Sequence, residues 1–121
     1  MIKAIKFVSI PVADQDRALE FYTGKLGFRV ITDSPFDATQ RWIELGIPRA
    51  DTKVVLFTAH GQEKMIGGFM NITFVADDVE ATANQLKERG VEFVQDPRKA
   101  DWGTAAIFKD LDGNLFVLST P

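Results

Sequence analysis

The chain has 121 residues, of which 45% are hydrophobic and 26% charged, and its formal net charge at pH 7 is −3. This composition fits one compact domain with an apolar core and does not fit a disordered chain. The weak negative charge argues against a nucleic-acid partner, and the absence of Cys excludes disulfides, zinc–thiolate sites and thiol nucleophiles. There is no signal-type apolar run and no stretch of membrane-spanning length, so we expect a cytoplasmic protein without a membrane partner.

A strand, a helix and a second strand are predicted for the first part of the chain. The residues from Phe7 to Val12 alternate and are rich in β-branched side chains, which indicates a strand. Asp14 stands where a helix N-cap belongs, and Gly27 is expected to end the helix. The next strand is predicted to begin with residues 28–32. The apolar face of the helix consists of Ala18, Leu19, Phe21, Tyr22 and Leu26.

Two more strands are predicted after this helix, over residues 41–45 and 53–58. The loop GIPRADT separates them, and the polar, glycine-containing segment HGQEKMIGG, residues 60–68, follows them. We expect this last segment to be a linker.

The same order of elements returns in the second half. Residues 72–75 are predicted to form a strand, and Asp77 is the expected N-cap, with Glu80 three residues later in a capping-box pairing. Gly90 is expected to stop the helix, and residues 91–94 to form the next strand. Residues 104–109 and 115–119 complete the set of strands. The apolar face of the second helix consists of Val79, Ala83 and Leu86.

An offset of 63 positions superposes the two halves. Residues 12–14 (VAD) fall on residues 75–77, Gly27 falls on Gly90, and no gap is needed between them. The pattern indicates two copies of one β-α-β-β-β module. The predicted fold class is therefore α+β, with two βαβββ modules that form an incomplete, trough-like mixed β-barrel. We expect a single domain over 1–121, with module one at about 1–59, the linker at about 60–68 and module two at about 69–121.

Two segments resemble a known family. They are VSIPVADQDRALEFYTGKLGF at residues 8–28 and AIFKDLDGNLFVL at residues 106–118, in which Leu111 replaces the usual Pro of the turn. They are similar to the vicinal oxygen chelate superfamily, which contains glyoxalases, bleomycin resistance proteins and extradiol dioxygenases. The resemblance implies the paired-module fold and a homodimer. It leaves the activity open, because this fold has several functions.

The resemblance also implies four positions for metal ligands, one in the first and one in the last strand of each module. Divalent ions there require His or carboxylate side chains. The residues at the four positions are all apolar: Phe7, Leu56, Met70 and Val117. The assignment of Leu56 allows one residue either way, which gives Val55 or Phe57 instead. Because none of these side chains is a His or a carboxylate, we expect no metal site and no cofactor.

These apolar side chains allow two interpretations. They fill the trough as core, or they line a pocket for a small organic ligand, as the bleomycin-resistance branch of the family does. Trp42 and Trp102 are expected at the pocket mouth, where indoles stack on planar or cationic ligands. The predicted ligand pocket consists of Phe7, Trp42, Glu44, Leu56, Met70, Trp102 and Val117.

Two residues are candidates for proton transfer. If Ile43 and Leu45 face the helix, Glu44 faces the trough, where a carboxylate acts as an acid or base or binds a cation. His60 is the only histidine and lies in the linker. The sequence thus leaves three hypotheses: a metal-free binding protein for an apolar, aromatic, antibiotic-like molecule; a metal-independent enzyme related to lyases, isomerases or dioxygenases; and a non-catalytic structural or regulatory domain.

Overall fold

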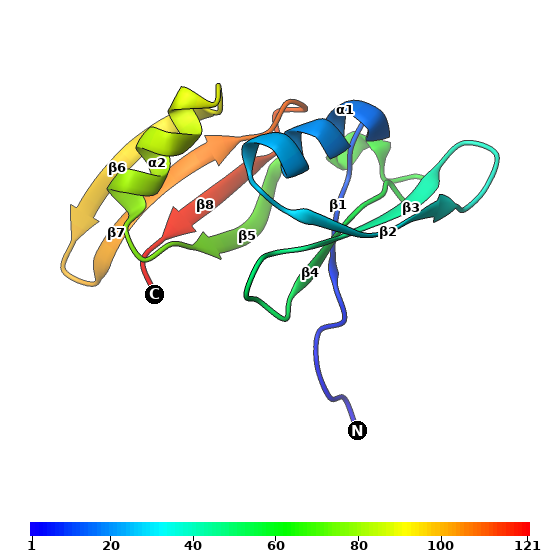
Figure 1. Cartoon of the computed structure of the whole chain (residues 1–121), viewed down its shortest axis with the longest axis horizontal. Coiled ribbons are helices and arrows are strands. Elements are labelled where there is room, and N and C mark those ends of the chain that lie inside the picture. The colour runs from blue at the N-terminus through cyan, green and yellow to red at the C-terminus, as the bar shows by residue number, and fades with distance from the viewer. The chain divides into compact units, whose positions relative to one another are not determined.

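The computed structural model describes residues 1–121, which divide into two compact units, Met1–Ile66 and Gly67–Pro121. Each unit has one four-stranded mixed sheet and one α-helix, and no closed barrel is present (Figure 1). Neither helix reaches the length and apolarity that crossing a membrane requires.

The first unit begins with strand β1 (Val8–Ile10), helix α1 (Gln15–Glu20) and a π-helical turn, η1 (Phe21–Lys25). Three antiparallel strands follow, and a short 3₁₀ turn, η2 (Glu63–Met65), lies near its end. The strand order is β1-β4-β3-β2, with β1 parallel to β4. These three strands are β2 (Arg29–Pro35), β3 (Arg41–Gly46) and β4 (Lys53–Leu56).

The second unit repeats this topology. Its strand order is β5-β8-β7-β6, and β5 is parallel to β8 just as β1 is parallel to β4. The predicted α+β class with two βαβββ modules is therefore confirmed. The elements are β5 (Phe69–Val75), α2 (Val79–Glu88), β6 (Glu92–Ala100), β7 (Gly103–Lys109) and β8 (Leu115–Ser119).

The two faces of the first sheet differ in burial. Partners in the strand register point to the same side of a sheet, and side chains alternate along each strand. The helix face of this sheet, defined as the side covered by α1, carries Ile10, Ile43, Leu45 and Leu56, all with no exposed surface. The opposite side, which we call the open face, carries the register partners Ser9, Val55 and Glu44, together with Trp42, and of these only Val55 is fully buried.

An aromatic core fills the helix face of the second sheet. The Nζ atom of Lys87 in α2 lies 5.5 Å from the ring centroid of Phe93, which places the helix on this side. Apolar side chains on one stripe of α2 are buried there, as predicted. The rings in contact on this face are Phe74, Phe93, Phe108 and Phe116.

The N-cap of the second helix is Asp78, and the prediction of Asp77 was wrong. The Asp78 carboxylate accepts a hydrogen bond of 3.0 Å from the backbone N–H of Ala81. Glu80 is then the second residue of the helix and not the third, so no capping box forms. Asp14 does cap the first helix, accepting from the N–H of Arg17 at 3.1 Å.

The two modules are therefore 64 positions apart at the caps and 63 apart at Gly27 and Gly90. The π-helical turn explains the difference, because a π turn places one extra residue in a helix. Its bond runs from the N–H of Leu26 to the carbonyl of Phe21 over 3.2 Å. The second module has its extra residue before the helix, and the first has it within the helix. An ungapped comparison of the sequences cannot show these two compensating insertions.

Candidate functional site

Four aromatic rings form a cluster on the open face of the first sheet, and we call them the aromatic cluster. Trp42 is central: its ring centroid lies 5.3 Å from that of Phe7, 5.9 Å from that of Phe36 and 5.2 Å from that of Phe57. Phe36 and Phe57 are 4.8 Å apart, edge to face. Phe36 is 56% exposed and the others are partly buried. The cluster is thus a patch of ring surface that water still reaches.

Glu44 lies beside this cluster. The indole N–H of Trp42 donates to Oε1 of Glu44 over 3.4 Å, and Nζ of Lys53 is 3.7 Å from Oε2. The Glu44 side chain is only 16% exposed. The carboxylate therefore places one partly screened negative charge at the edge of the aromatic surface. It can accept a hydrogen bond from a ligand or attract a positive group.

Leu56 does not lie with these residues. It pairs with Ile10, is fully buried, and belongs to the helix face. Val55 pairs with both Ser9 and Glu44, so it takes the open-face place that was assigned to Leu56. The sequence left this position uncertain by one residue, and only the register between β1 and β4 decides it.

In the second unit the predicted residues are spread out. Val117 is partly buried on the side of the second sheet that faces away from its aromatic core, paired with Thr73 and Ile107. Met70 is partly buried in β5, beside Asn71, whose φ of 58° interrupts the alternation of the strand.

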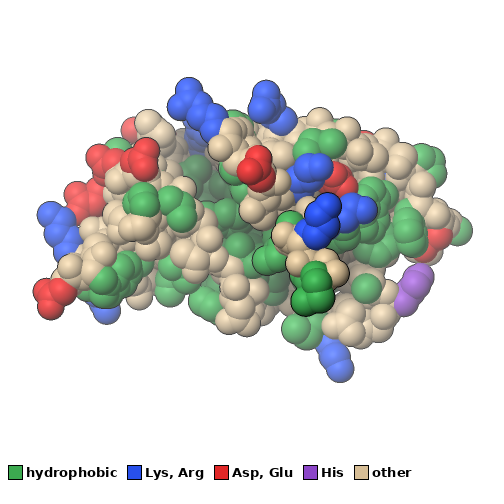
Figure 2. All heavy atoms as spheres, turned by 90° about the horizontal axis from the view of Figure 1, so that it is seen from below, with side chains coloured by type: hydrophobic (Ala, Val, Ile, Leu, Met, Phe, Trp, Pro, Cys, Tyr) green, Lys and Arg blue, Asp and Glu red, His purple; other side chains and the backbone are tan.

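Trp102 also lies in this unit, in the turn between β6 and β7, and is 66% exposed. It is not equivalent to Trp42. Glu44 pairs with Val55 in the first sheet, and Ile107 pairs with Val117 in the second. Ile107 therefore corresponds to Glu44, and Ala105, two residues earlier, corresponds to Trp42. Figure 2 shows hydrophobic side chains at the surface among charged ones, and Phe36 and Trp102 are among the large apolar side chains that are exposed.

The resemblance assigns four positions to metal ligands, and Phe7, Leu56, Met70 and Val117 were predicted to stand there. On the open face, Val55 stands in place of Leu56. None of these side chains is a carboxylate or an imidazole, the ligands that divalent metal ions require. No group of three or more His, Cys, Asp or Glu side chains lies close enough together to hold a metal ion.

His60 lies at a cavity of about 530 Å³ within the first unit. The cavity is bounded by the segment before α1, the turn between β2 and β3, the residues after β4 and the 60–68 linker. The Nε2 atom of His60 is 3.4 Å from Oδ2 of Asp37, and the imidazole side chain is 79% exposed. Glu44 does not line this cavity. The two candidate acid–base residues therefore do not share a site.

Two glutamine side chains, which sequence analysis did not single out, connect the start of β3 to the end of β4. They do so beyond the point where the backbones of these two strands stop pairing. The amide of Gln40 accepts from the N–H of Thr58 at 2.9 Å and donates to its carbonyl at 2.7 Å. The amide of Gln15 donates to the carbonyls of Arg41 and Leu56 at 2.7 and 2.8 Å, and accepts from the N–H of Arg41 at 2.8 Å. These bonds explain why β4 ends at Leu56 and not at Thr58 as predicted.

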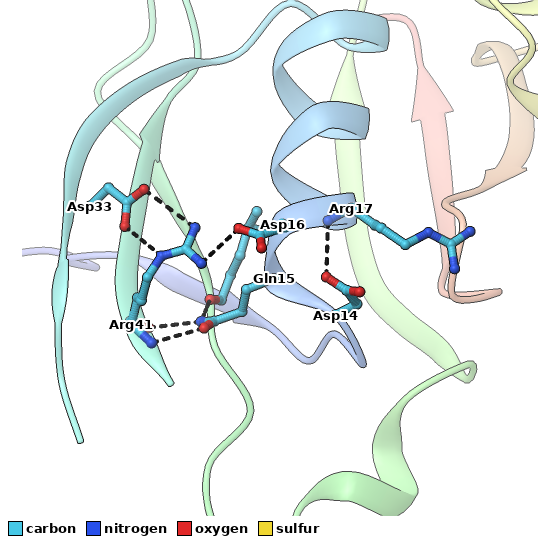
Figure 3. A network of polar contacts seen from close by, with 7 residues as sticks. Asp14, Gln15, Asp16, Arg17, Asp33 and Arg41 are labelled. Atoms are coloured by element: carbon cyan, nitrogen blue, oxygen red, sulfur yellow. Dashed lines mark hydrogen bonds and ion pairs between the residues drawn. The ribbon is translucent and has the colours of Figure 1, made fainter. Parts of the chain in front are cut away.

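An ion-pair network lies next to the Gln15 amide (Figure 3). The guanidinium of Arg41 bridges Asp16 in α1 and Asp33 in β2, at 2.7 and 2.9 Å. Hydrogen bonds to Asp33 and then to Asp16 raise the pKa of Arg41 above its ordinary value. The helix and the β2–β3 hairpin, which carries Phe36, are thus linked by a permanently charged residue.

Comparison with known proteins identifies the family. The chain is 37% identical to the uncharacterized protein YetH of Bacillus subtilis (strain 168), over 98% of each chain. A superfamily member from Sphaerobacter thermophilus DSM 20745 matches with a TM-score of 0.89 and 32% identity, covering 99% of this chain and 98% of that one. TnmS3, an antibiotic binding protein from Streptomyces sp. CB03234, matches with a TM-score of 0.87 and 34% identity, covering 99% and 97%. The sequence pattern of the Glyoxalase/Bleomycin resistance protein/Dioxygenase superfamily matches residues 4–118, and the chain therefore belongs to that superfamily.

Proposed function

We propose that this protein binds a flat, apolar or aromatic small molecule on the aromatic cluster, without a metal ion. The observation that carries the proposal is the partly exposed cluster around Trp42, whose indole N–H is directed at the Glu44 carboxylate. Ring surface left in contact with water favours a planar partner, because each new aromatic contact adds about 0.5–1.5 kcal/mol beyond area burial.

Glu44 adds a preference within this class of ligand. No positive group other than Lys53 is paired with its carboxylate, and Lys53 lies at the long distance of 3.7 Å. A planar ligand that carries a positive charge or an N–H donor gains an interaction there, whereas an anionic ligand meets repulsion. The expected ligand is therefore aromatic and neutral or cationic.

The similarity to TnmS3 supports a binding role, because that protein binds an antibiotic. The separation of Glu44 from His60 argues in the same direction. An enzyme that moves protons needs its acid–base group against the reacting atoms, and the single imidazole lines a cavity that Glu44 does not line.

Fluorescence of the Trp102→Phe variant tests the proposal, because Trp42 is then the only indole. Proflavine, a planar cation, should quench Trp42 with a saturable curve, and bleomycin should be tested alongside it. Naphthalene-2-sulfonate, a planar anion, should bind more weakly. The Glu44→Gln variant should bind proflavine about fivefold more weakly, with the anion unaffected or improved.

Phe57→Ala tests the cluster itself. It should weaken proflavine binding by about fivefold or more, whereas Phe69→Ala, which removes a 46% exposed ring of the second unit, should leave it unchanged. Unsaturable quenching, or equal effects of the two substitutions, would refute the assignment. Total metal analysis of the titrated sample, before and after incubation with Zn²⁺, Ni²⁺, Mn²⁺ or Fe²⁺, should show no stoichiometric ion; one tightly held ion per chain would contradict the metal-free mode.

A further inference from the structure

We propose that the cavity of the first unit is a second binding site, specific for an organic ammonium ion carried on a small apolar body. None of the four rings of the aromatic cluster lines this cavity. The inference is therefore independent of the proposed function. The cavity volume of about 530 Å³ lies within the range of small-molecule sites.

The walls of the cavity are held by internal hydrogen bonds. The Thr58 hydroxyl accepts from the N–H of Val12 and donates to the carbonyl of Val12, each at 2.9 Å, and the Gln40 amide pairs with the Thr58 backbone. Thr58 is 6% exposed. Because these groups satisfy one another, the walls are fixed in place before any ligand arrives.

The charge at the cavity is negative. Glu63 lines it and its carboxylate has no ion-pair partner, whereas no Lys or Arg lines it. The Asp37 carboxylate lies behind His60 and accepts from the N–H groups of Thr39 and Gln40 at 2.8 and 2.9 Å. These bonds, that of Thr39 first, lower the pKa of Asp37, so it is ionised at neutral pH. A cation is therefore attracted, and an anion is not.

The remaining lining explains why the ligand needs an apolar body. The aliphatic residues that line the cavity are Ala13, Ile66 and Val12, of which Val12 is only 4% exposed. A bare inorganic cation would leave these aliphatic groups in water, and no cluster of ligands is present to coordinate it. An ammonium group near Glu63 with a hydrocarbon or aryl group against the three aliphatic side chains satisfies both parts of the lining.

Benzylamine and benzyl alcohol are suitable probes, because they have similar shape and differ in charge at neutral pH. Titration of the ¹⁵N-labelled full chain, followed by NMR, should show saturable shifts for benzylamine at the amides of Ala13, Gln40 and His60. Benzyl alcohol should bind about fivefold more weakly or worse. Equal shifts for the two probes, or shifts confined to the Trp42 region, would overturn the proposal.

Glu63→Gln tests the charge at the site. Glu63 is exposed in a 3₁₀ turn and bonds to nothing through its side chain, so the variant is expected to fold. It should weaken benzylamine binding by about fivefold and leave benzyl alcohol unchanged. Glu80→Gln, at an exposed position of α2, is the matched control and should bind as the unchanged chain does. Wild-type affinity for benzylamine in Glu63→Gln would also refute the site.

Discussion

Replacing Gln15 with Ala tests whether one side chain continues the sheet where the backbone pairing of β3 and β4 ends. In the structure the Gln15 amide makes three hydrogen bonds of 2.7–2.8 Å to backbone groups of Arg41 and Leu56. The strands pair directly only from Glu44 with Val55 onward. Loss of the amide leaves two carbonyls and one N–H without their partner.

The expected loss follows from the number of bonds. Each hydrogen bond contributes about 1 kcal/mol net, or about 3 kcal/mol for three. Releasing the side chain returns about 1 kcal/mol of conformational entropy, so the free energy of unfolding should fall by about 2 kcal/mol. For a chain of this size that corresponds to a fall in Tm of about 8 °C.

Thermal and urea unfolding followed by circular dichroism measure this difference. Gln85→Ala is the matched control, because Gln85 is exposed in α2, and it should change stability by no more than about 0.5 kcal/mol. Gln15→Glu should be worse than Gln15→Ala, since a carboxylate would face the carbonyls of Arg41 and Leu56. If Gln15→Ala is as stable as Gln85→Ala, or if Gln15→Glu matches the wild type, the amide does not replace the missing strand pairing.

Two further predictions concern caps and pH. Asp78→Ala should cost about 1 kcal/mol in chemical denaturation while Asp77→Ala stays within about 0.5 kcal/mol; the reverse order would show that the modules are offset by 63 positions at the cap. The backbone N–H groups of Thr39 and Gln40 hold the pKa of Asp37 below its ordinary 3.8. The stability from Asp37 is therefore fully present above that ordinary pKa and is lost as pH falls through the lowered folded value. The Tm difference between wild type and Asp37→Ala should accordingly be larger at neutral pH than at about pH 2; an equal difference at both would contradict the pKa assignment.

Local signals in the sequence predicted the order of the helices and strands and the fold. Alternation in RWIELG places Ile43 and Leu45 on one side of a strand and Trp42 and Glu44 on the other, and the complete burial of Ile43 and Leu45 shows which side faces the helix. The strand-cap-helix segment at 8–28 and the turn-strand segment at 106–118 carried the resemblance to the superfamily. Such patterns depend on neighbours within one or two turns of the chain, which is why they can be read without coordinates.

The tertiary structure decided which side chains meet. The place of Leu56 depends on its register with Ile10, 46 positions earlier, and a one-residue shift moves it to the other face. Phe36 and Phe57 join Trp42 only because the β2–β3 turn and the end of β4 are brought together. The π turn hides a one-residue offset between the modules, and the bonds of Gln15 depend on two strands that separate. Apart from the π turn, which is a local bond within the first helix, each of these features depends on contacts between distant segments, for which the sequence pattern contains no local signal.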